Sequence, residues 1–435
     1  MKLFIKTLGC EKNTWDSDYA AGIMNAAGVE IAENPDDADF LIVNTCGFIN
    51  DAKKQSIEAI FELAGAKKPG QKLIVTGCLS QRYSKELADE IPEVDYFFGV
   101  NNYASLPDLL TSDIGRINVS PYPRKFEELG KRYVPDLSYT ASIKIAEGCN
   151  NICSYCIIPF IRGRYRSRMP EDIIREAELL AENGCKELVI IAQDVTAYGC
   201  DLNKDNMLAD LLRNLCKING IEWIRLMYCY EDEISDELIE VIKSEPKICK
   251  YLDIPIQHCS DKILKSMNRA STKSSIKLTI NKLRKQIPDI VIRTTLITGY
   301  PGESKDDFDE LYEFVSEMKF DRLGVFAYSK EEGTAAAKMK PQVRQDVKER
   351  RRDKIMELQR AISLENNQKY IGKTISVIIE EQDDDTSYIG RASFDAPEID
   401  NGVIISSAKK LYPGDIVSVQ VTDAFDYDLC GEIVL

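Results

Sequence analysis

The sequence predicts a mixed α/β protein with three parts: an N-terminal doubly wound parallel sheet, a central partial (β/α)6 barrel of TIM-like type, and a small C-terminal all-β barrel. Strand and helix patterns alternate through the first 105 residues or so, and then alternate six more times between residues 142 and 328. After a long charged helix, the chain turns to short strands punctuated by Gly and Pro. These three observations predict the three architectures, and 435 residues are too many for a single core.

The first part, residues 1–115, contains three strong strand patterns that are followed or separated by helical ones. The predicted strands are 2–8, 39–45 and 71–77. A strand–helix–strand alternation of this kind is typical of a parallel sheet with helices on both faces. Residues 116–137 contain prolines and show little periodicity, so we interpret them as a linker.

The second part, residues 138–368, repeats the alternation more regularly. Its predicted strands are 142–147, 187–193, 223–228, 251–256, 290–297 and 322–328. Six units are two short of a complete eight-unit barrel. A charged amphipathic helix over 341–369 connects to the third part, residues 369–435, where short strands are expected over 374–381, 387–393, 403–407 and 415–424.

Composition narrows the possible functions. No apolar run reaches the roughly 18 residues that a membrane span needs, and the N-terminus lacks a signal-peptide pattern, so we expect a cytoplasmic protein without a membrane partner. Thirteen cysteines in such a protein are unlikely to form disulfides. His258 is the single histidine, which argues against imidazole-based zinc or acid–base chemistry.

One group of three cysteines shares a structural position although its members lie far apart in sequence. Cys10, Cys46 and Cys78 each follow a predicted strand directly. The carboxyl ends of parallel strands meet at one edge of the sheet, where ligands bind. The alternative is three buried core thiols, but the repeated placement favours a metal site.

A second group lies in the segment "CNNICSYC", directly after the first strand of the central barrel. Cys149, Cys153 and Cys156 follow one another at spacings of four and three, and α/β barrels carry their active sites at this end of the strands. Thiols without imidazole suit an iron–sulfur cluster rather than zinc. Since a 4Fe–4S cluster normally takes four cysteines, three would leave one iron open to another ligand. Structural thiols, or a zinc knuckle that borrows a distant cysteine, are the less favoured alternatives.

The C-terminal part is acidic. Residues 370–435 contain four Lys and Arg against thirteen Asp and Glu, a net charge of −9 within a total of −15. Such a module repels phosphate backbones and favours a basic partner.

The CxxxCxxC spacing, with the aromatic Tyr155 before its last cysteine, resembles the signature of the radical S-adenosylmethionine (SAM) superfamily. Together with the upstream cysteines and the small β-barrel, essentially the whole chain resembles the methylthiotransferases, in the domain order methylthiotransferase, radical SAM core, TRAM. The segments "LGCEKNTWDSD", "VNTCGFINDAKKQSI" and "YLDIPIQHCSDKILKSMNR" resemble the RimO type in particular.

The resemblance implies two 4Fe–4S clusters and SAM as cofactors. Cys149, Cys153 and Cys156 match the positions that hold the cluster that binds and cleaves SAM, and Cys10, Cys46 and Cys78 match those of an auxiliary cluster that delivers sulfur. It also implies a substrate: the β-carbon of an aspartate in the basic small-subunit ribosomal protein S-twelve, free or on the ribosome. Two SAM equivalents and an electron donor such as flavodoxin or ferredoxin would be needed, and we expect a monomer.

Further site residues are weaker candidates, and none is assigned a catalytic role. For SAM binding, the candidates are Tyr155, Gln193, Arg293 and Thr295, although Thr295 stands where the "LITGYPGE"-like pattern of the family usually has Gly. For each of these residues, core packing or an ion pair is about as plausible. We interpret the remaining cysteines as structural, whereas His258 is as plausible facing the site as it is in a structural role. For the arginines of "RGRYRSR" (162, 164, 166 and 168), a solvated face is slightly favoured over a grip on an anionic group such as the substrate aspartate or a cofactor carboxylate.

Two alternative functions stay open at this point. A tRNA adenosine methylthiotransferase would use the same chemistry on a different substrate. A non-catalytic iron–sulfur electron carrier would need no open iron, and such carriers normally fill all four ligand positions.

Overall fold

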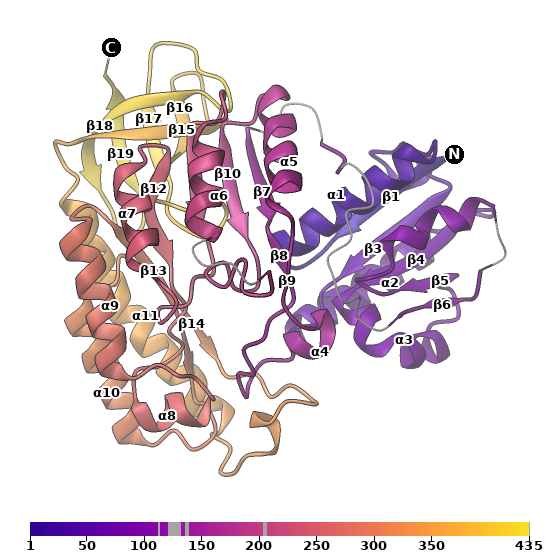
Figure 1. Cartoon of the computed structure of the whole chain (residues 1–435), viewed down its shortest axis with the longest axis horizontal. Helices are drawn as coiled ribbons and strands as arrows, with labels where there is room; N and C mark the ends of the chain where they lie inside the picture. Colours follow the sequence, from indigo (N-terminus) through magenta and orange to yellow (C-terminus); the bar gives the residue numbers. More distant parts are fainter. Residues whose placement is uncertain (112–113, 121–131, 135–138, 203–206, 435) are drawn as a thin grey trace.

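Parallel strands joined by helices build both large parts of the chain, and a closed barrel of mostly antiparallel strands forms the third (Figure 1). The computed structural model describes residues 1–111, 114–120, 132–134, 139–202 and 207–434. The mixed α/β class predicted from the sequence is confirmed. Within the described residues, none of the helices has the length and apolar character that a bilayer crossing requires.

The N-terminal sheet has six parallel strands in the order β2-β1-β3-β4-β5-β6. The strands are β1 Lys2–Thr7, β2 Glu30–Ile31, β3 Phe40–Thr45, β4 Lys72–Gly77, β5 Tyr96–Phe98 and β6 Ile117–Asn118. The helices are α1 Glu11–Ala26, α2 Asn50–Ala66 and α3 Cys78–Glu90, with 3-10 turns η1 Pro35–Asp37 and η2 Tyr103–Leu110. Helix α1 packs on one face and α2 and α3 on the other, which is the predicted doubly wound arrangement.

Strand β6 lies inside the segment that the sequence predicts to be a linker. It adds an edge strand through Phe97↔Ile117 pairing. A strand of two residues has no periodicity that a sequence pattern could reveal. Residues 121–131 and 135–138 of that segment lie outside the described residues.

The central sheet has six parallel strands in the order β14-β13-β12-β11-β10-β7, as expected for part of a barrel. Its strands are β7 Thr140–Lys144, β10 Glu187–Ile191, β11 Trp223–Leu226, β12 Ile248–Asp253, β13 Val291–Thr298 and β14 Arg322–Ala327. Its helices are α5 Pro170–Glu182, α6 Met207–Cys216, α7 Asp236–Ser244, α8 Asp261–Ser266, α9 Lys273–Gln286, α10 Lys305–Met318 and α11 Gln345–Gln368. Smaller elements are β8 Ala146–Glu147, α4 Ile158–Arg162, β9 Arg166–Ser167 and η3 Ala336–Lys338.

Alternation along the central strands separates two cores. Leu188 and Ile190 of β10 join the core under the surrounding helices. Val189 and Ile191 point to the opposite face, where they join a core shared with α1 and with the C-terminal barrel. Side chains on opposite faces alternate along a strand, so Arg293 and Thr295, which share the parity of Val291, belong to this second face.

The C-terminal barrel is closed, with strands β15 Thr374–Gln382, β16 Ser387–Ala392, β17 Val403–Ser406, β18 Ile416–Ala424 and β19 Leu429–Ile433. Buried ion pairs attach it to the central sheet. Arg391 reaches Glu187 of β10 at 2.5 Å, Asp395 pairs with Arg322 at 2.6 Å, and Asp400 pairs with Arg293 at 3.3 Å. Part of the acidic surplus therefore serves the domain interface and does not reach solvent.

Candidate functional site

The first three cysteines lie at the carboxyl edge of the N-terminal sheet. Cys10 is the N-cap of α1, Cys46 follows the last residue of β3, and Cys78 opens α3 directly after β4. Strands β3 and β4 are paired up to Thr45↔Gly77, so Cys46 and Cys78 leave adjacent strands at the same level. The sheet topology brings together the three thiols that the sequence singles out.

Glycines make room at this edge. A Cβ on Gly9, where φ is +100°, would lie 2.8 Å from the Cβ and 3.3 Å from the Sγ of Cys46, and a Cβ on Gly47 would lie 2.9 Å from the backbone where α3 begins. The donor set is entirely thiol, and thiols suit iron–sulfur clusters. The residues present therefore fit such a group. Across the described ranges, no set of three His, Cys, Asp or Glu side chains is placed to hold a single metal ion.

The second three cysteines lie in an irregular loop between β8 and α4. The loop is fixed to the rest of the barrel by hydrogen bonds: the Cys149 amide donates to Gly163 (3.1 Å), the Ser154 amide donates to Met267 (2.9 Å), and Asn268 donates to the carbonyl of Ile152 (3.1 Å). The Sγ of Cys153 lies 3.4 Å from the hydroxyl of Tyr230. All three thiols are free and none is fully exposed, so this donor set also fits an iron–sulfur cluster.

Burial controls the acidity of these thiols. It raises the pKa of Cys78 to about 11 and the pKa of Cys149 and of Cys156 to about 12. Thiolates are the metal ligands, so cluster binding must displace protons from these side chains.

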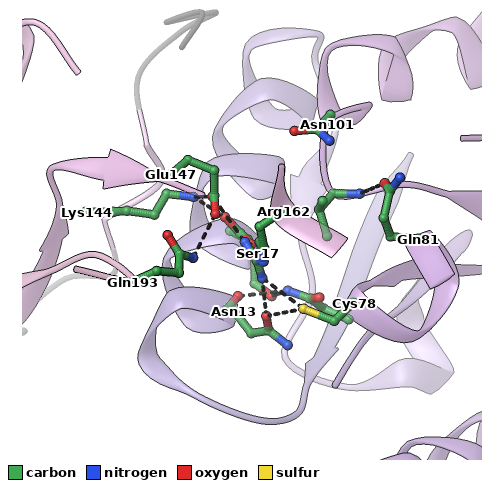
Figure 2. Close-up of polar contacts among 12 residues, drawn as sticks. Asn13, Ser17, Cys78, Gln81, Asn101, Lys144, Glu147, Arg162 and Gln193 are labelled. Carbon is green, nitrogen blue, oxygen red and sulfur yellow. Dashed lines mark hydrogen bonds and ion pairs between the residues drawn. The ribbon is translucent and has the colours of Figure 1, made fainter. Parts of the chain in front are cut away.

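A buried charge network connects the two cysteine sites (Figure 2). The guanidinium of Arg162 lies 2.6 Å from a carboxylate oxygen of Asp16 and 3.1 Å from Glu147. It also donates to Asn13 Oδ1 at 2.6 Å and reaches the Sγ of Cys78 at 3.3 Å. Lys144 pairs with the same two carboxylates, at 2.5 and 2.6 Å.

Glu147 lies between the two parts of this network. It is two residues before Cys149, and its Oε1 accepts from the amide of Gly148 at 3.3 Å and from Gln193 at 2.8 Å. Burial alone would raise the pKa of Glu147, but Arg162 and Lys144 outweigh it and hold that pKa well below its usual range. One side chain, Arg162, thus joins the loop of Cys149 to the thiol of Cys78.

The interpretation of the four arginines as a solvated face is wrong for three of them. Arg162, Arg166 and Arg168 are 1–3% exposed, and only Arg164 points to solvent. Arg168 pairs with Glu176 of α5 at 2.7 Å. Arg162 pairs with Asp16 and Arg166 donates to Asn101, both far away in sequence, so a local pattern could not show these contacts.

Two of the SAM-site candidates lie near the second cysteine loop. Gln193 donates to Glu147, and within the part of the chain that the structure describes its own buried Oε1 has no hydrogen-bond partner. Tyr155 packs against the buried group of Met267, Tyr300 and Tyr328. Both residues are therefore placed where they could border a cofactor bound at the second cysteine loop.

The other two candidates lie on β13. Arg293 pairs with Asp253 at 3.1 Å and with Asp400 of the C-terminal barrel, and it donates to Thr295 Oγ1 at 3.3 Å. Its charge is thus already matched by protein carboxylates. His258 is fully buried, and its Nδ1 accepts from the amide of Ser260 at 3.0 Å, which fits a structural role.

A cavity of about 150 Å³ opens beside Cys153. Its lining includes Asn151, Tyr230, Asp232 and Arg269. Tyr230, Glu147 and Lys12 were not among the residues chosen from the sequence. Glu147 and Lys12 each stand two positions from a chosen cysteine, which is the signal that could have found them.

Gly148, just before the second loop, supports a stability prediction. Its φ is +82°, and a Cβ there would collide with the backbone oxygens of Gly163 and Arg164. Left-handed backbone costs roughly 1–2 kcal/mol and overpacking about 1–3 kcal/mol, so Gly148→Ala is expected to lower the free energy of unfolding by about 2–5 kcal/mol in urea denaturation.

Gly184→Ala is the matched control, since Gly184 has a similar φ of +92° and open space around it. Only the roughly 1–2 kcal/mol backbone term applies there. Equal losses for the two variants would show that the loop is free to move away from the added methyl group.

Family models match each of the three parts. Residues 2–99 match the uncharacterized protein family UPF0004, residues 143–315 the radical SAM superfamily, and residues 371–434 the TRAM domain. Relatives named "Ribosomal protein uS12 methylthiotransferase RimO" align over the full length. The one from Clostridioides difficile (strain 630) is 50% identical over 100% of this chain and 99% of its own. The one from Caldicellulosiruptor saccharolyticus is 48% identical over 100% of both.

Solved structures share the fold at low identity. The radical SAM methyltransferase TsrM from Kitasatospora setae, with cobalamin and a [4Fe-4S] cluster bound, superposes with a TM-score of 0.59 at 12% identity, covering 77% of this chain and 73% of that one. The cobalamin-dependent SAM radical enzyme OxsB, with SAM bound, gives a TM-score of 0.53 at 11% identity, covering 83% and 56%.

Proposed function

The chain belongs to the RimO family of radical SAM methylthiotransferases, and we propose that it replaces a hydrogen on the β-carbon of an aspartate in ribosomal protein uS12 by a methylthio group. The observation that carries the proposal is the Arg162 network, which joins Cys78 to the loop of Cys149. A substrate carbon between two such sites can meet both.

The proposed ligands are the six cysteines: Cys10, Cys46 and Cys78 for the auxiliary 4Fe–4S cluster, and Cys149, Cys153 and Cys156 for the SAM cluster. When bound, these clusters and two equivalents of SAM supply the radical that abstracts hydrogen and the methylthio group that is transferred. We assign Gln193 and Tyr155 to the border of the SAM site, because Tyr155 lies within the Cys149 loop and Gln193 donates to Glu147 just before it.

The protein's own contribution is alignment and exclusion of water. The Cys149 loop is held by backbone hydrogen bonds on both sides, and Cys78 packs with Ile157 and Ile161 in a small buried apolar group. Ile157 directly follows Cys156, so the same apolar side chains border both cysteine sites and exclude water from between them. Closed apolar surroundings of this kind protect reactive intermediates from water.

A strain that lacks the gene tests this function. We expect uS12 from that strain to lack the methylthio group that the parent strain carries, with methylthio-adenosine in tRNA unchanged, as measured by mass spectrometry of both. Loss on tRNA alone would replace the proposal by the tRNA function, and an unchanged pattern in both would favour an iron–sulfur carrier. A flavodoxin or ferredoxin donor, a monomeric state and a cytoplasmic location complete the proposal.

Exposed acids on the C-terminal barrel support the choice of a basic protein substrate. Asp383, Asp384 and Asp385 lie exposed in the turn between β15 and β16. Exposed charges mainly accelerate association and are screened by salt. Converting all three to Asn is expected to weaken uS12 binding several-fold at low salt and to have little effect at 0.5 M salt or so, measured by stopped-flow fluorescence.

The control removes three exposed acids elsewhere: Glu86, Asp89 and Glu90 on α3. It lowers the net negative charge equally but leaves the barrel unchanged. Equal slowing in both variants would mean that only total charge matters.

A further inference from the structure

Lys12, in the first turn of α1, is a buried lysine that forms no ion pair with a carboxylate among the described residues, and burial lowers the pKa of its ammonium. It is 8% exposed and stands two residues after Cys10. In the described part of the chain its ammonium makes no hydrogen bond or ion pair; it lies instead over the ring of Tyr228, 3.0 Å from the ring centroid. Buried lysines are normally paired, as Lys144 is with Asp16 and Glu147.

Glu11 and Asp253 are close enough to favour the charged form of Lys12 through space, but neither forms an ion pair with it in the described residues. Asp253 pairs with Arg293 and accepts from the amide of Tyr228 at 3.1 Å. Glu11 is adjacent in sequence, but among the described residues no ion pair within 4 Å joins it to Lys12, and its buried Oε2 has no hydrogen-bond partner there. The ammonium thus keeps its capacity to donate to an incoming anion.

Tyr228 is held under the ammonium by a strained backbone. Its φ is +59°, a conformation that costs a non-glycine residue free energy and persists where the surroundings impose it. Its amide donates to Asp253, and its carbonyl accepts from Val195 at 3.1 Å. An aromatic face can stabilise a desolvated ammonium through a cation–π interaction. The Lys12–Tyr228 pair is therefore preorganised in the absence of a ligand.

The pair spans the two halves of the proposed reaction site. Lys12 lies in the first turn of α1, two residues after the N-cap Cys10. Tyr228 lies two residues beyond the carboxyl end of β11. The loop of Cys149 leaves the same edge of that central sheet after β7. An anionic group bound by Lys12 would be reachable from both cysteine sites.

We propose that Lys12 binds the side-chain carboxylate of the substrate aspartate, with Tyr228 supporting its ammonium, so that the adjacent β-carbon faces the two clusters. The inference rests on the proposed function and deepens it, since it names the residue that selects an aspartate. A carboxylate would form a charge-assisted hydrogen bond with Lys12, and a neutral adenine base offers no anion there.

The test compares binding of two uS12 peptides to the reconstituted holoenzyme, one with the target aspartate and one with asparagine in its place. We expect the wild-type protein to prefer the aspartate peptide by about 10-fold or more. In Lys12→Met the ratio of the two Kd values should fall to about 1, whereas Lys54→Met, which changes an exposed lysine of α2, should keep the wild-type ratio.

Tyr228→Leu gives a second readout with Lys12 intact and should lower the ratio to an intermediate value. A Lys12→Met protein that keeps the wild-type ratio, or a wild-type protein without preference, overturns the inference. If Lys12→Met loses iron and cannot be compared, the Tyr228→Leu ratio decides, and an unchanged ratio there also overturns it. A wild-type enzyme that modifies tRNA and not uS12 overturns the proposed function itself, which is a separate outcome.

Discussion

Arg162→Met is expected to lower the free energy of unfolding by about 3–5 kcal/mol, because it removes one partner from a buried ion-pair network. Arg162 is 1% exposed, and it faces Asp16 and Glu147 at 2.6 and 3.1 Å. With the guanidinium gone, Lys144 alone would have to balance both carboxylates. Urea denaturation of the metal-free protein under reducing conditions measures the loss.

Arg164→Met is the matched control, because Arg164 lies two residues away and is exposed. Its loss should stay within about 0.5 kcal/mol, as for surface substitutions in general. If the two variants lost equal stability, Arg162 would not be the link between the N-terminal sheet and the barrel.

Cys153→Ala and Cys78→Ala are expected to separate the two cysteine sites by activity. Each variant should retain about half of the roughly eight irons that two 4Fe–4S clusters contain. Cys153→Ala should form no 5′-deoxyadenosine from SAM under reducing conditions. Cys78→Ala should still form it, but methylthio transfer to uS12 should fall to background.

Cys185→Ala serves as the control for this pair, since Cys185 is buried and donates to the carbonyl of Glu187. Its iron content and both activities should match those of the unchanged protein. Full iron content in Cys78→Ala, measured alongside, would contradict an auxiliary cluster at the first site.

Periodicity and strand order made the fold predictable from the sequence. The β3 segment, Phe40–Thr45, is buried along its whole length, and its continuous apolar run over residues 40–43 is typical of a central parallel strand. The five short strands β2, β5, β6, β9 and β19 were missed, because two to five residues carry too little pattern. The cysteine sites were predictable because parallel strands end together.

The side-chain network of the site was not predictable, since it depends on contacts between distant segments. Arg162 pairs with Asp16, which lies 146 positions earlier in sequence. From the local sequence alone, a run of arginines predicts a solvated face. The alternation that turns Arg293 toward Asp400 depends on register, which a single strand does not reveal. The role proposed for Lys12 depends on Tyr228, which lies more than 200 positions later in sequence and beneath its ammonium.

The most direct test of the central claim is tandem mass spectrometry of uS12 after reaction with the anaerobically reconstituted protein, SAM and a reductant. The claim predicts that a methylthio group replaces one hydrogen on a single aspartate of uS12, and that 5′-deoxyadenosine forms in the same reaction. Unmodified uS12 in a reaction that adds methylthio groups to tRNA, or that forms no 5′-deoxyadenosine at all, would contradict it.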